Sequence, residues 1–286
     1  MTDATAPALN GDLSETALVA RACAKDRTAF QALVRDARKP LRTVVRRLVG
    51  HPEDTEDIVQ ETLLRAWDGI AEFQGKSRFS TWLCAIGTRL AIDHLRRQQR
   101  WRPEAQVAYA NLCASSEEYG MEAMGAIMAP EFSYEVREHI AYCFVCVGRS
   151  LPPDDQAALV LRDVMGMDTR EAAKALEVTE SVLRHRLSAA RREMTQTYEG
   201  LCSLVSKQGI CYQCKGLREA APEARRGEPA PSIETMVERL AIARDADIDT
   251  GKSQIMHDVF WQRTKEIEDT GAGSVEPESD CGQDDT

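Results

Sequence analysis

Basic side chains gather on one face of the segment between Thr179 and Met194. If this segment is a helix, its apolar residues face inward and its outward positions carry Arg184, His185, Arg186, Arg191 and Arg192. Guanidinium groups pair with guanine edges or phosphates, and Thr179 and Ser181 could reach either. These residues predict a helix that lies in the major groove of DNA. The alternative is a basic face that is simply solvated.

The residues before this segment form the support that such a helix needs. Gly166 interrupts an earlier helical pattern, and a short helix can begin at Asp168 or Thr169. A turn at Val178-Thr179 then leads into the basic helix. Two helices joined by a turn of three to four residues, with the second one basic, are typical of a helix-turn-helix.

A second basic strip combines cations with aromatic rings. Phe79 and Trp82 lie where a loop enters a predicted helix, and the later turns of that helix carry Arg89, Arg96 and Arg97. Rings beside cations suit single-stranded DNA, because unstacked bases stack on the rings while the cations follow the phosphates. A tryptophan that packs in the core is the other interpretation of Trp82.

The segment from Pro52 to Gly69 predicts a helix with an acidic first turn, as the helix dipole favours. Its apolar face is separate from a second face that is polar except for one leucine. That second face carries Asp57, Gln60, Glu61 and Leu64. It is either ordinary solvent-exposed surface or a site at which another protein docks.

A third group of residues could bind a metal ion. The spacing i, i+4 and i+7 could place His139, Cys143 and Cys146 on one helical face. Further along, glycines bracket a C-x2-C pair, which favours the turn of a zinc site. A tetrahedral zinc ion would take Cys143, Cys146, Cys211 and Cys214, with His139 or Cys202 as substitutes. The alternatives are cysteines that only pack in helices and a dithiol redox switch.

Composition bounds the class of protein. The chain has 286 residues and a formal net charge of −10, but residues 215–286 alone hold 17 acidic and 9 basic residues. No run of 18 apolar residues occurs and no hydrophobic signal region begins the chain, so we expect a cytoplasmic protein that does not enter a membrane. Its nine cysteines are then reduced thiols, metal ligands or redox sensors sooner than disulfides.

Taken in order, these segments resemble a known family. The acidic helix EDTEDIVQETLLRAW precedes FQGKSRFSTWLCAIGTRLAIDHLRR, a variable linker, and then LPP…EAAKALEVTESVLRHRLSAARREM. This order is similar to that of the extracytoplasmic-function (ECF) sigma factors, a subfamily of the sigma-70-type sigma factors of bacterial RNA polymerase. The resemblance covers about residues 15–102 and 134–200.

The resemblance implies a role for each face. The face with Asp57, Gln60, Glu61 and Leu64 would dock on core RNA polymerase. The −10 promoter element would be opened and read by Phe79, Trp82, Arg89, Arg96 and Arg97. The −35 element would be contacted by Thr179, Ser181, Arg184, His185 and Arg186.

Two positions depart from the family pattern. Arg89 stands where an asparagine is common, and arginine cannot accept a hydrogen bond, so the base preference at this position is in doubt. Ala172 stands where isoleucine is usual, which removes one larger core side chain and should affect function little.

The expected fold is all-α, with two small helical domains, a flexible linker and a partly helical C-terminal extension. The domains are residues 13–105 (region 2-like) and 134–200 (region 4-like), flanked by a disordered start at 1–12, an acidic linker at 106–133 and an extension at 201–286. We expect a non-catalytic sigma factor that requires no cofactor. Its partners would be core polymerase and promoter DNA, and either an anti-sigma factor or the extension could restrain it. The alternatives are a helix-turn-helix regulator that never binds polymerase and a zinc or thiol sensor with a DNA-binding output.

Overall fold

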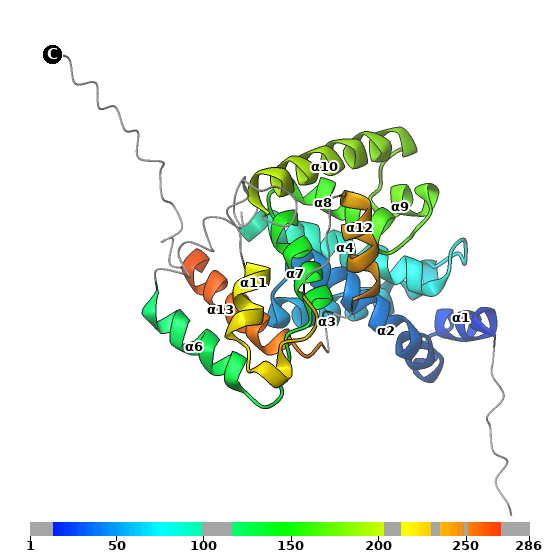
Figure 1. Cartoon of the computed structure of the whole chain (residues 1–286). Coiled ribbons are helices and arrows are strands. Elements are labelled where there is room, and N and C mark those ends of the chain that lie inside the picture. The colour runs from blue at the N-terminus through cyan, green and yellow to red at the C-terminus, as the bar shows by residue number, and fades with distance from the viewer. Residues whose placement is uncertain are drawn as a thin grey trace, which may run out of the picture.

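The computed structural model describes residues 14–98, 116–202, 213–229, 235–246, 248 and 251–269 (Figure 1). Every regular element within these ranges is a helix, which confirms the all-α prediction. None of these helices is both long and apolar enough to cross a bilayer.

Module A comprises the first four helices: α1 (Glu15–Cys23), α2 (Arg27–Val49), α3 (Pro52–Gly69) and α4 (Phe79–Gln98). Ser14, Asp26 and His51 cap α1, α2 and α3, because each side chain accepts a hydrogen bond from a backbone N–H in the first turn. The central pair, α2 and α4, approach closely at Gly87. A Cβ added there would lie 2.4 Å from Cδ1 of Leu41, so any larger residue would require the Leu41 side chain to move.

Module B comprises α7 (Val136–Gly148), α8 (Pro153–Leu159), the π-helical turn η2 (Val160–Val164), α9 (Thr169–Ala175) and α10 (Glu180–Leu201). Asp168 and Glu171 form a reciprocal capping box at the start of α9, and Thr179 caps α10. Gly166 has a φ of +71°, a left-handed conformation that ends the preceding helix. The α9–α10 pair confirms the predicted helix-turn-helix.

Further helices lie between and after the two modules. The predicted linker contains α6 (Glu117–Met128), and the C-terminal part contains α11 (Gln213–Ala220), the short 3-10 turn η3 (Glu223–Arg225), α12 (Met236–Asp245) and α13 (Gln254–Asp269). The C-terminal part is thus partly helical, as the sequence predicted. The turn predicted for the C-x2-C pair lies mostly outside the described residues, and α11 begins at Gln213 and runs through Cys214 and Gly216. From here on, the extension means α11 to α13.

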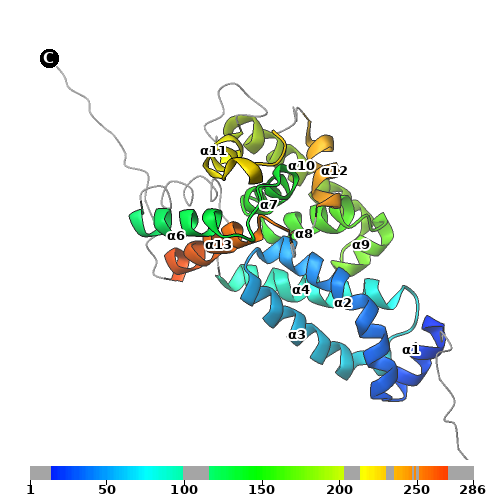
Figure 2. The same cartoon turned by 60° about the horizontal axis from the view of Figure 1, so that its bottom comes forward.

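The two modules pack directly against each other, with module B over α2 and α4 of module A (Figures 1 and 2). One apolar cluster runs through both of them. It joins Leu41 and Leu90 of module A to Leu161, Leu176 and Leu187 of module B. The extension lies against both modules, since α12 contacts α7 and η2 of module B and Asp258 of α13 pairs with Arg46 of module A. The α13 helix also runs beside α6 (Figure 2).

Candidate DNA and polymerase interfaces

The first two turns of α10 present the residues predicted to contact the −35 element. Thr179, Ser181, Arg184 and His185 are all exposed. The Thr179 hydroxyl accepts a hydrogen bond from the Val182 N–H at 3.2 Å, which fixes the start of the helix. Arg184 pairs with Glu180 one turn earlier at 2.8 Å, but both side chains are well exposed. Such a surface pair contributes little, so Arg184 can exchange it for a contact with DNA.

Arg186 points away from this exposed surface. Its side chain is 25% exposed and pairs with Asp154 of α8 at 2.9 Å. Asp155 lies 4.0 Å from the same guanidinium group. Burial raises the pKa of the Asp155 carboxyl, and the positive charge of Arg186 opposes that shift. Arg186 therefore contacts module B itself in this arrangement.

The aromatic residues predicted for the −10 element lie at two depths. Phe79 is 1% exposed and packs edge-on against Phe30 and Phe73, with ring centroids 6.0 and 6.1 Å away. Trp82 is half-buried, and its ring lies 5.7 Å from Phe79 and 4.9 Å from Phe73. A base could therefore reach Trp82 directly, whereas Phe79 supports the tryptophan from below.

Trp82 also borders an open hollow of about 360 Å³ between the end of α3 and the middle of α4. The other lining residues include Arg65, Glu72, Ile86, Arg89 and Asp93. The hollow thus combines an aromatic face with two guanidinium groups. That combination suits an unstacked base together with its phosphate.

Two arginines of α4 contact acidic residues of module B. Arg89 forms an ion pair with Glu177, which follows α9. Arg96 pairs with Asp154, the same carboxylate that binds Arg186. The third predicted cation, Arg97, stays exposed and donates to the Asp93 carbonyl of its own helix at 3.2 Å.

The face of α3 predicted to dock on polymerase is open. Asp57, Gln60, Glu61 and Leu64 are all exposed, and Leu64 is 62% exposed although it is apolar. Arg65 forms an ion pair with Glu61 at 2.7 Å along the same helix. The opposite face of α3 is buried at Val59 and Ala66, so the two faces separate as the sequence predicted.

The predicted metal ligands on α7 have different neighbours. His139 stacks on His257 of α13, with ring centroids 5.2 Å apart. Cys143 packs with the cluster around Tyr198 and Leu240, and Cys146 packs beside Trp261. Within the described residues no three His, Cys, Asp or Glu side chains converge on one point.

The other candidate ligands do not test the zinc hypothesis, which stays a prediction. Cys202 accepts a hydrogen bond from the buried Arg239 guanidinium at 3.0 Å. Cys211 lies outside the described residues, and so does the side chain of Cys214. Burial lowers the pKa of His139 to about 4, so this imidazole is neutral near pH 7.

Sequence reasoning missed the residues that hold the modules and the extension together. Arg46 of α2 pairs with Asp258 of α13, 212 positions later in the chain. Trp261 is 2% exposed, and it was not assigned to a core from the sequence. Its size and its apolar neighbours Val259 and Phe260 were the available signal, because an aromatic side chain buries a large apolar area.

The comparisons with known proteins agree with this geometry. Residues 33–101 match the family model "Sigma-70 region 2", and residues 145–194 match "Sigma-70, region 4". The ECF RNA polymerase sigma factor SigG of Mycobacterium tuberculosis (strain ATCC 25618 / H37Rv) is 31% identical over 176 residues, which cover 58% of this chain and 47% of SigG.

Two shorter relatives are matched along nearly their full length. The RNA polymerase sigma-H factor of Pseudomonas aeruginosa is 27% identical over 186 residues, or 64% of this chain and 93% of that protein. The ECF RNA polymerase sigma-E factor of Escherichia coli (strain K12) is 29% identical over 196 residues, or 68% and 98%. The chain therefore spans about half the length of SigG (47%) and almost all of these two. With both modules matched in the predicted order, the chain belongs to the ECF subfamily of sigma-70-type RNA polymerase sigma factors.

Proposed function

We propose that this protein binds core RNA polymerase, recognises the −35 and −10 elements of a promoter and promotes strand separation at the start of transcription. It catalyses no reaction itself. The polymerase would contact the open face of α3, where Leu64 supplies an exposed apolar anchor among Asp57, Gln60 and Glu61. A central apolar side chain with a polar rim is the usual composition of a protein interface.

The −10 element would be held by α4 and the hollow beside it. Trp82 would stack on an unpaired base, while Arg89, Arg96 and Arg97 follow the phosphates. Phe79 would act beneath Trp82 by keeping the indole in place. The strands would open because the single-stranded bases gain these binding sites, at steps that unstack easily.

The −35 element would be read in the major groove by the start of α10. Arg184, His185 and Ser181 are exposed there, and Thr179 can contact a phosphate at the helix N-terminus. Arg186 would join them once it leaves Asp154.

The observation that carries this proposal is that one chain combines an exposed helix-turn-helix with a second module whose hollow is lined by a tryptophan and two arginines beside two carboxylates. A helix-turn-helix regulator needs only the first of these.

The decisive experiment is run-off transcription with purified core polymerase and this protein on a library of promoter fragments. We expect defined start sites that appear only when the protein is present. Failure of the protein to form a complex with core polymerase, combined with binding to duplex DNA, would favour the regulator instead.

Two further predictions follow from other features of the chain. As a polymerase subunit the protein would act in the cytoplasm. A zinc or redox function of Cys143, Cys146, Cys211 and Cys214 is a separate proposal, and metal analysis of the protein with and without Cys211→Ser and Cys214→Ser tests it. Metal-free protein with normal activity would exclude zinc.

A further inference from the structure

With the two modules packed together, the chain is too narrow to span the distance between the −35 and −10 elements of a promoter. Elements named −35 and −10 lie about 25 base pairs apart, which is about 85 Å of duplex at 3.4 Å per base pair. A compact body of the size of the described residues has a radius of gyration of about 17 Å and is roughly 45 Å across. Trp82 and Arg184 therefore cannot reach both elements until the modules separate.

The same arrangement occupies the cations that DNA would need. Arg89 and Arg96 of module A are paired with Glu177 and Asp154 of module B, and Arg186 pairs with the same Asp154 within module B. Each of these arginines is one of the predicted DNA contacts. A carboxylate that binds a guanidinium group competes directly with a phosphate for the same N–H groups.

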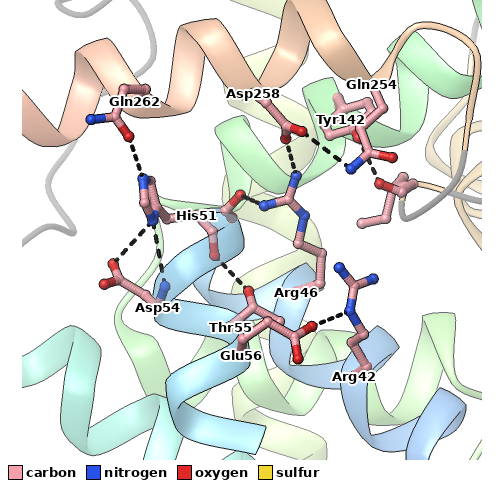
Figure 3. A network of polar contacts seen from close by, with 12 residues as sticks. Arg42, Arg46, His51, Asp54, Thr55, Glu56, Tyr142, Gln254, Asp258 and Gln262 are labelled. Atoms are coloured by element: carbon pink, nitrogen blue, oxygen red, sulfur yellow. Dashed lines mark hydrogen bonds and ion pairs between the residues drawn. The ribbon is translucent and has the colours of Figure 1, made fainter.

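The extension binds module A through a polar network on α13 (Figure 3). Arg46, with a side chain 1% exposed, pairs with Asp258 at 2.7 Å. His51 contacts the Gln262 amide at 3.3 Å, one turn further along α13 (Figure 3). These contacts join the end of α2 and the start of α3 to the extension.

A second set of contacts continues this attachment. Lys265 reaches Asp54 at 3.1 Å, and the Arg47 guanidinium donates to the Ala246 carbonyl at 3.0 Å. Burial opposes ionisation of Asp54, but hydrogen bonds from His94 and Lys265 hold the pKa of its carboxyl well below the usual range. The carboxylate therefore stays charged and bound to Lys265.

The extension binds module B at the same time. The Tyr142 hydroxyl donates to the Ile248 carbonyl at 2.6 Å, and the Tyr142 ring stacks on His257 at 3.7 Å. The Arg244 guanidinium donates to the Asp163 carbonyl in η2. The extension therefore contacts module B at two places, the helix α7 and the turn η2 that precedes the helix-turn-helix.

Trp261 touches both modules with one side chain. Its ring fills the space beside Gly50 of module A, where an added Cβ would lie 2.6 Å from the indole. The Arg149 guanidinium of module B lies over the same ring, 5.2 Å from its centroid. The indole is 2% exposed, so it is enclosed where the two modules and α13 meet.

The polymerase-docking face is not covered by these contacts. Asp57, Gln60, Glu61 and Leu64 remain exposed although α13 contacts the first turn of the same helix. The closed chain thus pairs two predicted DNA-binding arginines of α4 with carboxylates and leaves the α3 face accessible.

We propose that the extension is a built-in clamp: α12 and α13 hold the two modules closed, so that this sigma factor can dock on core polymerase but cannot bind the −35 and −10 elements together until the clamp opens. The proposal rests on the function proposed above for its DNA and polymerase faces. The evidence that the extension holds the modules closed is independent of that function, and consists of the contacts of Trp261, Arg46 and Lys265.

Two variants of the full-length chain test the clamp. Trp261→Ala removes the shared side chain, and Lys265→Glu places a third acid beside Glu53 and Asp54 without entering the core. We expect both to increase the radius of gyration, measured by small-angle X-ray scattering, by about 3 Å or more. Circular dichroism and cooperative urea unfolding show that each variant is still folded.

The DNA measurement uses a fluorescein-labelled 40-base-pair duplex of mixed sequence. Freeing the two arginines of α4 should make the dependence of log K on log salt steeper by about 2 and strengthen binding at low salt by about tenfold. Ile255→Ala, a truncation of an exposed α13 side chain, and Lys215→Glu, the same charge reversal on α11, should both match the wild type.

Core polymerase capture completes the test. The wild type and both opening variants should bind polymerase within about threefold of each other. If both variants keep the size and the DNA affinity of the wild type, the clamp proposal is overturned. If polymerase binds only the variants, the clamp blocks polymerase docking as well, and the proposal that it blocks DNA binding alone is overturned. If no form binds polymerase, the proposed function fails, while the scattering and duplex measurements still decide whether the clamp exists.

Discussion

An arginine that pairs with a carboxylate uses the same guanidinium N–H groups that would bind a DNA phosphate. The strength of its carboxylate pair therefore decides how readily each arginine can bind DNA. Arg184 has only a weak partner on its own helix, Glu180, and is 64% exposed. Arg186 is paired to Asp154 across the module. Adjacent arginines on α10 therefore differ in how readily they reach DNA.

Substitution of Arg184 tests its proposed role in base recognition. Arg184→Ala should cost about 1–3 kcal/mol of binding at one −35 base pair, because a bidentate contact with a base edge is lost. Binding by an opened chain, such as Trp261→Ala, to single-base variants of a mapped promoter measures this loss. An equal loss on all sequences, with a salt dependence reduced by about 1, would instead identify a phosphate contact.

Substitution of Trp82 tests the proposed stacking role. Trp82→Ala should leave −35 duplex binding unchanged and impair strand opening, because about 1–3 kcal/mol of base stacking is lost. Permanganate reactivity of unpaired thymines in the polymerase complex reports the opening. Trp82→Phe keeps an aromatic face and should recover part of the activity. If Trp82→Ala opens the promoter normally, the residue only packs against Phe73 and Phe79.

At the scale of elements, local sequence chemistry accounts for most helices and for few of their contacts. Asp168 and Thr179 predicted the start of α9 and of α10, because capping is a short-range interaction. The bracketing Gly216 lies inside α11, since glycine permits a turn without requiring one. Trp261 was overlooked because its partners, Gly50 and Arg149, lie far away in the sequence.

The junction between α2 and α3 gives a prediction at this scale. Gly50→Ala should destabilise the chain, because Gly50 has a φ of +81° and an added methyl group would meet the Trp261 ring at 2.6 Å. Gly75→Ala is the matched control, with a φ of +65° and no atom within 4 Å. We expect about 1–2 kcal/mol for Gly75→Ala and about 1–3 kcal/mol more for Gly50→Ala.

Urea unfolding of both glycine variants, and of each in a Trp261→Ala background, separates backbone strain from the clash. In the Trp261→Ala background, the loss of unfolding free energy caused by Gly50→Ala should fall to nearly the loss caused by Gly75→Ala. If Gly50→Ala and Gly75→Ala lower the unfolding free energy equally in the wild-type background, the Trp261 side chain moves away from the added methyl group without loss of stability.

At the scale of the whole molecule, the sequence predicted two helical modules and their surfaces but not how they lie together. The cations and acids that pair across the modules, such as Arg89 with Glu177, look like solvated charges when read along the chain. Only the folded chain reveals that the extension also joins them, because Arg46 and Asp258 are separated by 212 positions. Interfaces between modules depend on such pairs, which have no periodicity to detect.

The buried histidines where the extension meets α7 make the stability of the whole chain depend on pH. Burial lowers the pKa of His139 to about 4, and burial together with the charges of His139 and Arg46 lowers that of His257 further. The groups that face His257 are His139 and Tyr142 on α7 and Arg46 on α2. None of these is an acid that would stabilise a protonated imidazole.

Both pKa values lie below the unfolded value of about 6.5, so the unfolded chain takes up protons that the folded chain refuses. The stabilisation is therefore complete above about pH 6.5 and is lost as the pH falls toward 4. We expect the free energy of unfolding, measured with urea, to fall by about 1–3 kcal/mol between pH 7.5 and 5.0. His139→Phe should flatten this dependence, while His185→Gln, at an exposed position, should leave it unchanged. A wild-type stability that stays constant over this range would mean that the imidazoles are protonated without opening the contact between α7 and α13.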